Sequence, residues 1–185
     1  MIRIGLDFDG VVVYDPVRVV RAPVKWFKKR VLGMRKLTYY VPHNRWQQML
    51  WKIVFGAGIW PAKGVNELRE LGKNSDIELY LITGRFKFLE KNINWWLKKN
   101  NLAHVFKSIT INEHNEQPHL FKERTIKKLK LDYYVEDNLD VVQHLAERLD
   151  CKILWVYNML DVTRNYPYKF PYLQKTIEWI RNDIN

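Results

Sequence analysis

The chain has 185 residues, of which 47% are hydrophobic and 14% aromatic. This length fits one domain, or one domain with an insertion, and this composition supplies a packed core and excludes disorder throughout the chain. The single cysteine, Cys151, excludes an intrachain disulfide framework and favours a reducing compartment. Because Cys151 opens an apolar run, we expect it to be a buried core residue and not a nucleophile.

The net charge of +11 is unevenly distributed along the chain. Between Tyr14 and Trp60 stand ten lysines and arginines but a single acid, Asp15, so this quarter of the chain holds nine of the eleven excess positive charges. A local field of this kind attracts polyanions or phosphorylated ligands. The alternative is a basic surface that is merely solvated.

Nothing in the sequence predicts a membrane protein. No apolar run reaches the roughly 20 residues that a membrane-spanning helix needs. Asp7 and Asp9 interrupt the apolar run at the N-terminus, which argues against a signal peptide. We therefore expect a soluble, cytoplasmic protein with no membrane partner.

The predicted elements begin with a buried strand at residues 2–8. Residues 14–60 differ in character, being basic and rich in tryptophan and tyrosine, and two amphipathic helices are expected there, at 24–37 and 43–55. After this segment, helices and strands alternate regularly. The expected order is helix 61–71, strand 78–83, helix 88–100, strand 108–111, helix 121–131, strand 132–137, helix 139–149, strand 152–156 and helix 171–181. Five strands alternating with helices predict an α/β fold in three layers around a parallel sheet.

The first strand ends in two acids and a glycine, Asp7-Phe8-Asp9-Gly10. The C-terminal edge of a parallel sheet is where α/β proteins bind ligands, and alternation along an ideal strand would place both carboxylates on one face. Two anions held that close favour a cation between them, and a Mg²⁺ site with one carboxylate free to attack phosphorus is the simplest interpretation. The alternative is an acidic turn that follows a strand.

Three later segments carry polar groups at strand ends or helix starts. Thr83 and Gly84 end the second core strand, and the threonine hydroxyl with the backbone N–H groups of this turn could hold phosphate oxygens. Lys122 offers a positive charge near the start of a helix. Glu136 and Asp137 end another strand and could complete a magnesium site. Alone, each segment has an ordinary explanation, namely a turn, a surface lysine, and acids that favour the start of a helix.

The order and spacing of these four segments resemble the haloacid dehalogenase superfamily of phosphotransferases. Asp7-x-Asp9-Gly-Val matches its first motif, Thr83 its second, Lys122 its third, and Glu136-Asp137 its fourth. The resemblance covers about residues 1–13 and 61–160. It implies a Rossmann-like core at 1–13 and 61–185 and a small helical cap inserted at 14–60.

The resemblance implies a role for each matching residue. Asp7 would be the nucleophile that forms an aspartyl phosphate, and Asp9 would be the general acid and then the general base. The Asp7 carboxylate, the Asp9 backbone carbonyl and Asp137 would hold Mg²⁺, while Thr83, Gly84 and Lys122 would bind the phosphoryl oxygens. The spacing of the fourth motif leaves two further candidate residues for the surroundings of the metal, Glu136 and Asp140. Arg85, which follows the Thr-Gly turn, could contact phosphate or the leaving group.

The second acid, Asp9, favours phosphate monoesters, because the dehalogenase branch of the superfamily lacks it. The residues of the motifs are most similar to those of the 5′(3′)-deoxyribonucleotidase branch. This resemblance implies a Mg²⁺-dependent phosphatase that acts on a phosphorylated small molecule, with a nucleotide as the favoured substrate. The basic insertion keeps two alternatives open. One is a phosphatase acting on phosphorylated nucleic-acid ends, and the other is a non-catalytic, basic nucleic-acid-binding protein built on the same scaffold.

Overall fold

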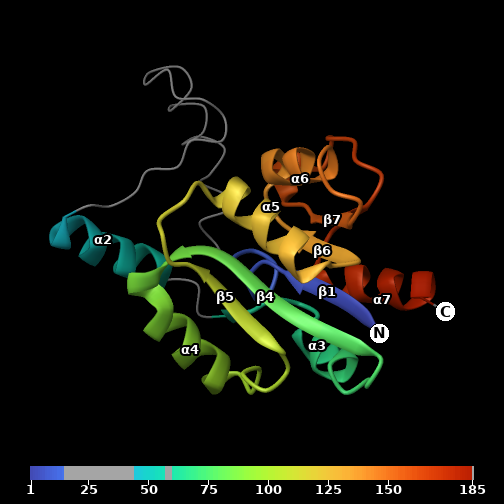
Figure 1. Ribbon diagram of the computed structural model, residues 1–185, viewed down its shortest axis with the longest axis horizontal. Helices are drawn as coiled ribbons and strands as arrows, with labels where there is room; N and C mark the ends of the chain where they lie inside the picture. The colour runs from blue at the N-terminus through green and yellow to red at the C-terminus, as the bar shows by residue number, and fades with distance from the viewer. Residues whose placement is uncertain (15–43, 57–59, 185) are drawn as a thin grey trace.

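A six-stranded parallel sheet forms the centre of the molecule, in the order β5-β4-β1-β6-β7-β8 (Figure 1). The structure, a computed structural model, describes residues 1–14, 44–56 and 60–184. Along the chain, the strands of this sheet are β1 (Ile2–Leu6), β4 (Ile77–Phe86), β5 (Ser108–Asn112), β6 (Tyr133–Glu136), β7 (Lys152–Val156) and β8 (Lys169–Phe170).

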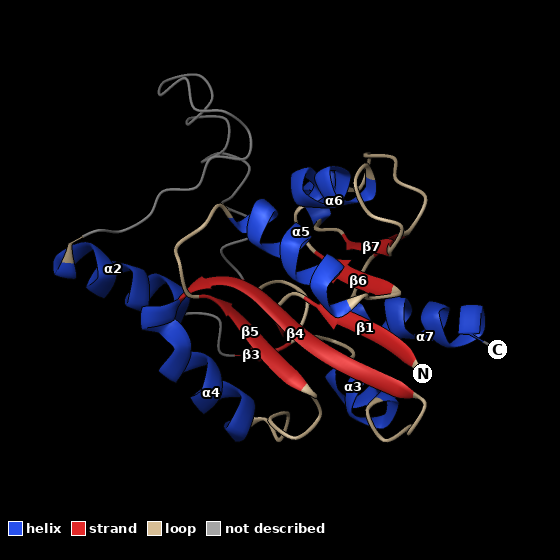
Figure 2. Ribbon diagram, viewed as in Figure 1, coloured by secondary structure: helices blue, strands red, loops and turns tan. Residues whose placement is uncertain are grey.

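Helices cover both faces of the sheet, as Figure 2 shows. Helices α3, α4 and α7 pack on one face, and α5 and α6 pack on the other. Their bounds are α3 (Val65–Leu71), α4 (Glu90–Lys99), α5 (Pro118–Leu129), α6 (Leu139–Ala146) and α7 (Leu173–Ile184). Two short 3₁₀ turns also occur, at Lys87–Leu89 and Met159–Asp161.

Strand β4 shows why the sheet needs cover on both sides. Leu79 and Leu81 pack into the core under α3, α4 and α7, whereas Tyr80 and Ile82 pack into the core under α5 and α6. Successive side chains of a strand point to opposite faces, so a strand buried on both faces is a continuous apolar run. The predicted three-layer α/β fold with a parallel sheet is confirmed.

Strand β1 lies in the middle of the sheet, paired with β4 on one side and β6 on the other. Its register with β4 runs from Ile2 opposite Ile77 to Leu6 opposite Leu81, and Leu6 also faces Val135 of β6. The C-terminal end of β1 therefore lies between the C-terminal ends of its two neighbours.

Two short strands bring together the parts of the chain on either side of residues 15–59. Strand β2 (Val13–Tyr14) pairs in antiparallel fashion with β3 (Trp60–Pro61). Between them, the structure describes α2 (Arg45–Gly56), close to the helix predicted at 43–55. The helix predicted at 24–37 lies outside the described residues. In the described part of the chain, no helix combines the length and apolar character needed to cross a membrane.

Several predicted boundaries were wrong. Strand β1 ends at Leu6, and β4 continues through Gly84 to Phe86 instead of ending at the glycine. Helix α5 begins three residues earlier than expected, at Pro118, because a proline at the first helical position gives up no hydrogen bond. Strands β2, β3 and β8 were not predicted, since two residues carry no periodic signal.

Cys151 was predicted to be buried and is instead partly exposed, directly before β7. Its side chain packs against the core that α5 and α6 cover. Burial, together with the nearby Asp132, raises the pKa of the thiol to about 12. The thiol is therefore protonated at neutral pH, as expected of a structural cysteine.

Candidate active site

Polar side chains from four distant segments meet at the C-terminal edge of the sheet. They come from the loop after β1, the end of β4, the first half of α5 and the end of β6. Because the strands are parallel, these ends lie together at the edge where α/β folds bind ligands. The backbone N–H of Asp7 donates to the carbonyl of Val135 at 2.9 Å, which ties the loop after β1 to β6.

A tight turn follows Asp7 and sets the direction of the chain. The N–H of Val13 donates to the carbonyl of Phe8 at 2.9 Å, and the N–H of Gly10 donates to the carbonyl of Val13 at 2.8 Å. Gly10 has a φ of 77°, in the left-handed region that glycine adopts without steric cost. The turn thus explains why a glycine follows the second acid.

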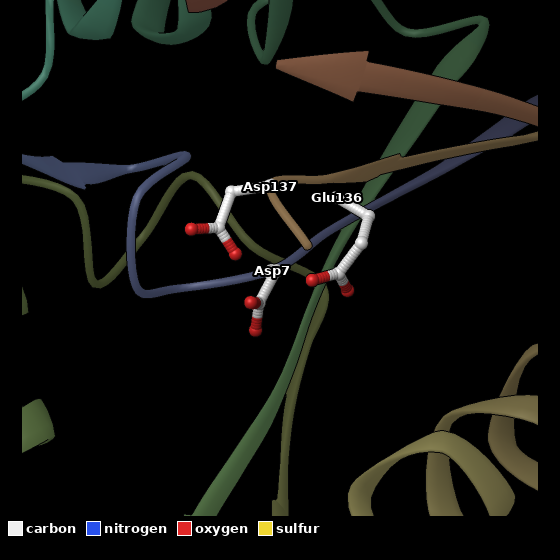
Figure 3. A group of neighbouring side chains, drawn as sticks. All are labelled: Asp7, Glu136 and Asp137. Atoms are coloured by element: carbon white, nitrogen blue, oxygen red, sulfur yellow. The ribbon is translucent and has the colours of Figure 1, made fainter. Parts of the chain in front are cut away.

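Three buried carboxylates form an acidic cluster: Asp7 from the loop after β1, and Glu136 and Asp137 from the end of β6. Each offers an oxygen that lies within 4.8 Å of oxygens of the other two. Figure 3 shows the three side chains gathered around one region beside the C-terminal end of β6. The predicted grouping of Asp7 with Glu136 and Asp137 thus corresponds to a real proximity in the structure.

Lys122 of α5 contacts two members of this acidic cluster. Its Nζ lies 3.0 Å from Oδ2 of Asp7 and 2.6 Å from Oε2 of Glu136. Its side chain is only 5% exposed, so these ion pairs form largely out of water. Burial would lower the pKa of Lys122, but the Asp7 and Glu136 carboxylates outweigh it and hold that pKa above its usual value. Lys122 is therefore a permanent positive charge at the site.

Burial raises the pKa of two carboxyl groups of the acidic cluster. Burial and the neighbouring carboxylates raise the pKa of Asp7 well above its ordinary value, although Lys122 opposes the shift. Burial likewise raises the pKa of Glu136, again against Lys122. Carboxylate oxygens held this close together repel one another unless a cation lies among them, and they are ligands that Mg²⁺ prefers. The residues present therefore fit a magnesium ion.

Asp9 does not join the acidic cluster. Its two carboxylate oxygens accept hydrogen bonds from Arg85, Oδ2 from Nε at 2.8 Å and Oδ1 from Nη2 at 2.5 Å. We had expected Asp7 and Asp9 to share one face, but β1 ends at Leu6, so strand alternation does not extend to them. Asp7 faces Lys122 while Asp9 faces Arg85.

Thr83 and Gly84 lie where β4 approaches α5. The Thr83 hydroxyl is fully buried and accepts the backbone N–H of Arg85 at 3.2 Å. A Cβ at Gly84 would stand 3.0 Å from Cβ of Pro118 and 3.9 Å from Cε of Lys122. The missing side chain thus allows the start of α5 to approach β4 closely enough to place Lys122.

Asp140, a candidate from the spacing of the fourth motif, lies in the first turn of α6. Its backbone N–H donates to Oδ1 of Asn138, which caps the helix at 3.1 Å. Its carboxylate is not part of the acidic cluster. The structure therefore separates Asp140 from Asp7, Glu136 and Asp137.

Two supporting residues were missed by the sequence analysis. The indole Nε1 of Trp155 donates to the backbone carbonyl of Asp137 at 3.1 Å and fixes the chain at the end of β6. The hydroxyl of Tyr134 lies 3.4 Å from Oε2 of Glu136 and 3.3 Å from the carbonyl oxygen of Ile82. Both side chains lie within apolar runs, so their polar atoms gave no separate signal.

Comparisons with known proteins were made by sequence and by structure. No family model matches the sequence, and no curated protein matches it either. Solved structures do match over nearly the whole chain. A putative β-phosphoglucomutase from Thermotoga maritima aligns with a TM-score of 0.64 at 15% identity, covering 98% of this chain and 99% of the other. The chain has the haloacid dehalogenase fold.

Two further structures with this haloacid dehalogenase fold support the assignment. A predicted phosphoglycolate phosphatase from Haemophilus somnus aligns with a TM-score of 0.61 at 13% identity over 96% of both chains. A HAD-superfamily hydrolase from Ehrlichia chaffeensis aligns with a TM-score of 0.56 at 13% identity, covering 99% of this chain and 97% of the other. Identities this low establish the fold and leave activity to be argued from the site.

Proposed function

We propose that this protein is a Mg²⁺-dependent phosphomonoesterase that works through an aspartyl phosphate on Asp7. The observation that carries the proposal is the acidic cluster, with Lys122 bridging Asp7 and Glu136 in the haloacid dehalogenase fold. A carboxylate held beside an ammonium and a cation site can attack a phosphorus atom whose oxygens those positive charges neutralise.

In the proposed mechanism, the chain's own residues act in two half-reactions. An Asp7 oxygen attacks phosphorus, the bond to the leaving oxygen breaks, and Asp9 gives that oxygen a proton. Water then attacks the aspartyl phosphate and Asp9 takes up its proton, so that phosphate leaves and Asp7 is regenerated. Lys122, Thr83 and the backbone N–H of Gly84 would hold the phosphoryl oxygens.

The metal would be held by Asp7, Asp137 and the backbone carbonyl of Asp9. Glu136 is the weaker candidate ligand, because one of its oxygens is engaged by Lys122 and the other accepts the backbone N–H of Asn138 at 3.1 Å. When bound, Mg²⁺ would supply charge neutralisation at the phosphoryl group.

For the substrate we propose a nucleotide, selected by the basic segment at 14–60 acting as a cap. The pairing of β2 with β3 supports this arrangement, because it brings the two ends of the segment together beside the loop that carries Asp9. The nine excess positive charges of the segment would attract a phosphorylated ligand.

A phosphorylated nucleic-acid end is a second candidate substrate, favoured by exposed aromatic side chains on this segment. Tyr14 of β2 and Trp60 of β3 lie opposite each other and are 51% and 58% exposed, and Trp46 of α2 is 65% exposed. Exposed aromatic rings are suited to stacking on bases. Steep loss of binding with added salt would favour a polynucleotide over a mononucleotide, since each phosphate contact releases counterions.

The test is a phosphatase screen with Mg²⁺ over nucleotides, sugar phosphates, phosphorylated oligonucleotides and a small aryl phosphate. We expect turnover to require Mg²⁺, to be abolished in Asp7→Asn and to persist in Asp150→Asn, an exposed acid elsewhere on the molecule. Turnover that survives chelation of the metal, or a folded Asp7→Asn protein with wild-type rates, would refute the mechanism.

Charge reversal at Lys28, Lys29, Arg35 and Lys36 tests the selecting role of the basic segment. If the segment selects the substrate, catalytic efficiency should fall strongly on a nucleotide or an oligonucleotide and little on the aryl phosphate. Equal losses on all three substrates, or none, would remove that role.

A further inference from the structure

The side chain of Arg85 binds the carboxylate of Asp9 through two hydrogen bonds. Nε and Nη2 of its guanidinium reach the two carboxylate oxygens side by side, at 2.8 and 2.5 Å. The Arg85 side chain is 4% exposed and the Asp9 side chain 12%, so the pair is largely shielded from water. A planar guanidinium that binds both oxygens fixes the plane of the carboxylate as well as its position.

The backbone conformation around Arg85 fixes the direction in which its side chain points. In the pairing of β4 with β5, Thr83 is opposite Ile111 and Phe86 is opposite Asn112, so Gly84 and Arg85 are extra residues at an irregularity in the ladder. Irregularities of this kind re-aim side chains next to functional sites. Here the irregularity lets the N–H of Arg85 bond the Thr83 hydroxyl.

An aromatic stack supports the guanidinium from another side. Cζ of Arg85 lies 4.8 Å from the centroid of the Phe8 ring, and Phe8 in turn packs edge-on against Trp96 of α4 at 5.3 Å. Phe8 and Trp96 are buried, and the stack restricts where the guanidinium can move. Arg85 is therefore held by Asp9, by Phe8 and by its own backbone.

From these contacts we infer that Arg85 is a positioning residue that orients Asp9 for proton transfer, and that it thereby sets how well the site expels poor leaving groups. The inference rests on the proposed function and deepens it. Each carboxyl oxygen has two lone pairs, and the bidentate contact with Arg85 occupies one on each, so an outward lone pair remains to carry a proton. From the sequence, Arg85 was expected to contact phosphate or the leaving group, and the structure shows its contact with Asp9.

The proton balance shows which substrates should depend on Arg85. An alkoxide is a strong base, so its departure from phosphorus requires the proton that Asp9 carries, whereas a nitrophenolate leaves without one. Water later returns one proton to Asp9 as the aspartyl phosphate is cleaved. Because kcat/KM reports steps up to departure of the leaving group, it isolates the first transfer from the second.

The experiment compares kcat/KM of Arg85→Lys and Arg85→Gln on p-nitrophenyl phosphate and on the alkyl phosphate that turns over best. Lysine keeps the charge but cannot bind both oxygens in one plane. We expect both variants to lose about 100-fold on the alkyl ester, the typical contribution of a general acid, and less than about fivefold on the aryl ester. Lys87→Ala is the matched control, because it removes an exposed cation two residues along the chain, paired with Glu113 at 3.5 Å.

A double variant separates action through Asp9 from any other role. If Arg85 acts through Asp9, Asp9→Asn with Arg85→Gln should be no worse on the alkyl ester than Asp9→Asn alone, within about twofold. Equal losses on both esters in the folded Arg85→Lys protein, or additive losses in the double variant, would overturn the inference and leave the phosphatase proposal standing. An inactive wild-type protein would instead remove the proposed function, and the inference with it.

Discussion

Lys122→Met should destabilise the protein far more than the loss of an ordinary lysine. At an effective dielectric constant of 20, its contacts with Asp7 and Glu136 correspond to gross attractions of roughly 5 to 6 kcal/mol each. Desolvation of the buried ammonium offsets much of this, and breaking a buried ion pair typically costs about 3–5 kcal/mol net. We expect a loss in that range when no divalent cation is present, because the acidic cluster is then left without its lysine.

The assay is urea unfolding with a chelator present, repeated with Mg²⁺. Lys127→Met is the matched control, since Lys127 lies on the same helix, is 55% exposed and pairs with Glu123 at 2.7 Å. An exposed pair of this kind contributes less than about 1 kcal/mol. Mg²⁺ should recover part of the loss in Lys122→Met by replacing the missing positive charge. Equal stabilities of the two variants would refute the claim that Lys122 neutralises the acidic cluster.

Two further predictions concern the metal and pH. Asp137→Asn should weaken the stabilisation by Mg²⁺, which reaches about 2.7 kcal/mol in the wild type at 100 times the dissociation constant. Thermal melts at increasing Mg²⁺ concentration would measure this stabilisation. If the melting temperature depends on Mg²⁺ in the same way in both proteins, Asp137 is excluded as a ligand. Burial, and then His144, lowers the pKa of His119 below 6.5. Below pH 6.5, His119 therefore binds a proton more readily in the unfolded chain than in the folded chain. The contribution of neutral His119 to the free energy of unfolding should be fully present above pH 6.5 and should be lost as the pH drops through the folded pKa. Urea unfolding between about pH 7.5 and 5 should show a smaller fall in His119→Gln than in the wild type, and equal falls would exclude this histidine.

The fold and the acidic cluster were predictable because their signals are local. Apolar runs of strand length alternating with helical periodicity identified the five long strands of the parallel sheet, and acids placed directly after two of those runs identified Asp7 and Asp137. Parallel topology then requires strand ends to meet at one edge. Lys122 was expected near phosphate, and the structure adds its contacts with Asp7 and Glu136.

The partner of Arg85 and the short strands depended on contacts between distant residues. Asp9 and Arg85 are 76 positions apart, and their pairing follows from an irregularity in β4 that a glycine permits but does not identify. Strands β2, β3 and β8 form through pairing with distant segments, and each has only two residues, too few to show a periodic pattern in the sequence. Packing and register, which no single segment encodes, decided these features.

Trapping the covalent intermediate tests the central claim most directly. Asp9→Asn protein, mixed with Mg²⁺ and p-nitrophenyl phosphate, should form the aspartyl phosphate but lack the base that hydrolyses it. Borohydride reduces an acyl phosphate to the alcohol, so mass spectrometry of the digested protein should find homoserine in place of Asp7, and only when substrate and Mg²⁺ are both present. Release of nitrophenolate with no modification at Asp7, or with modification at another acid, would contradict the account.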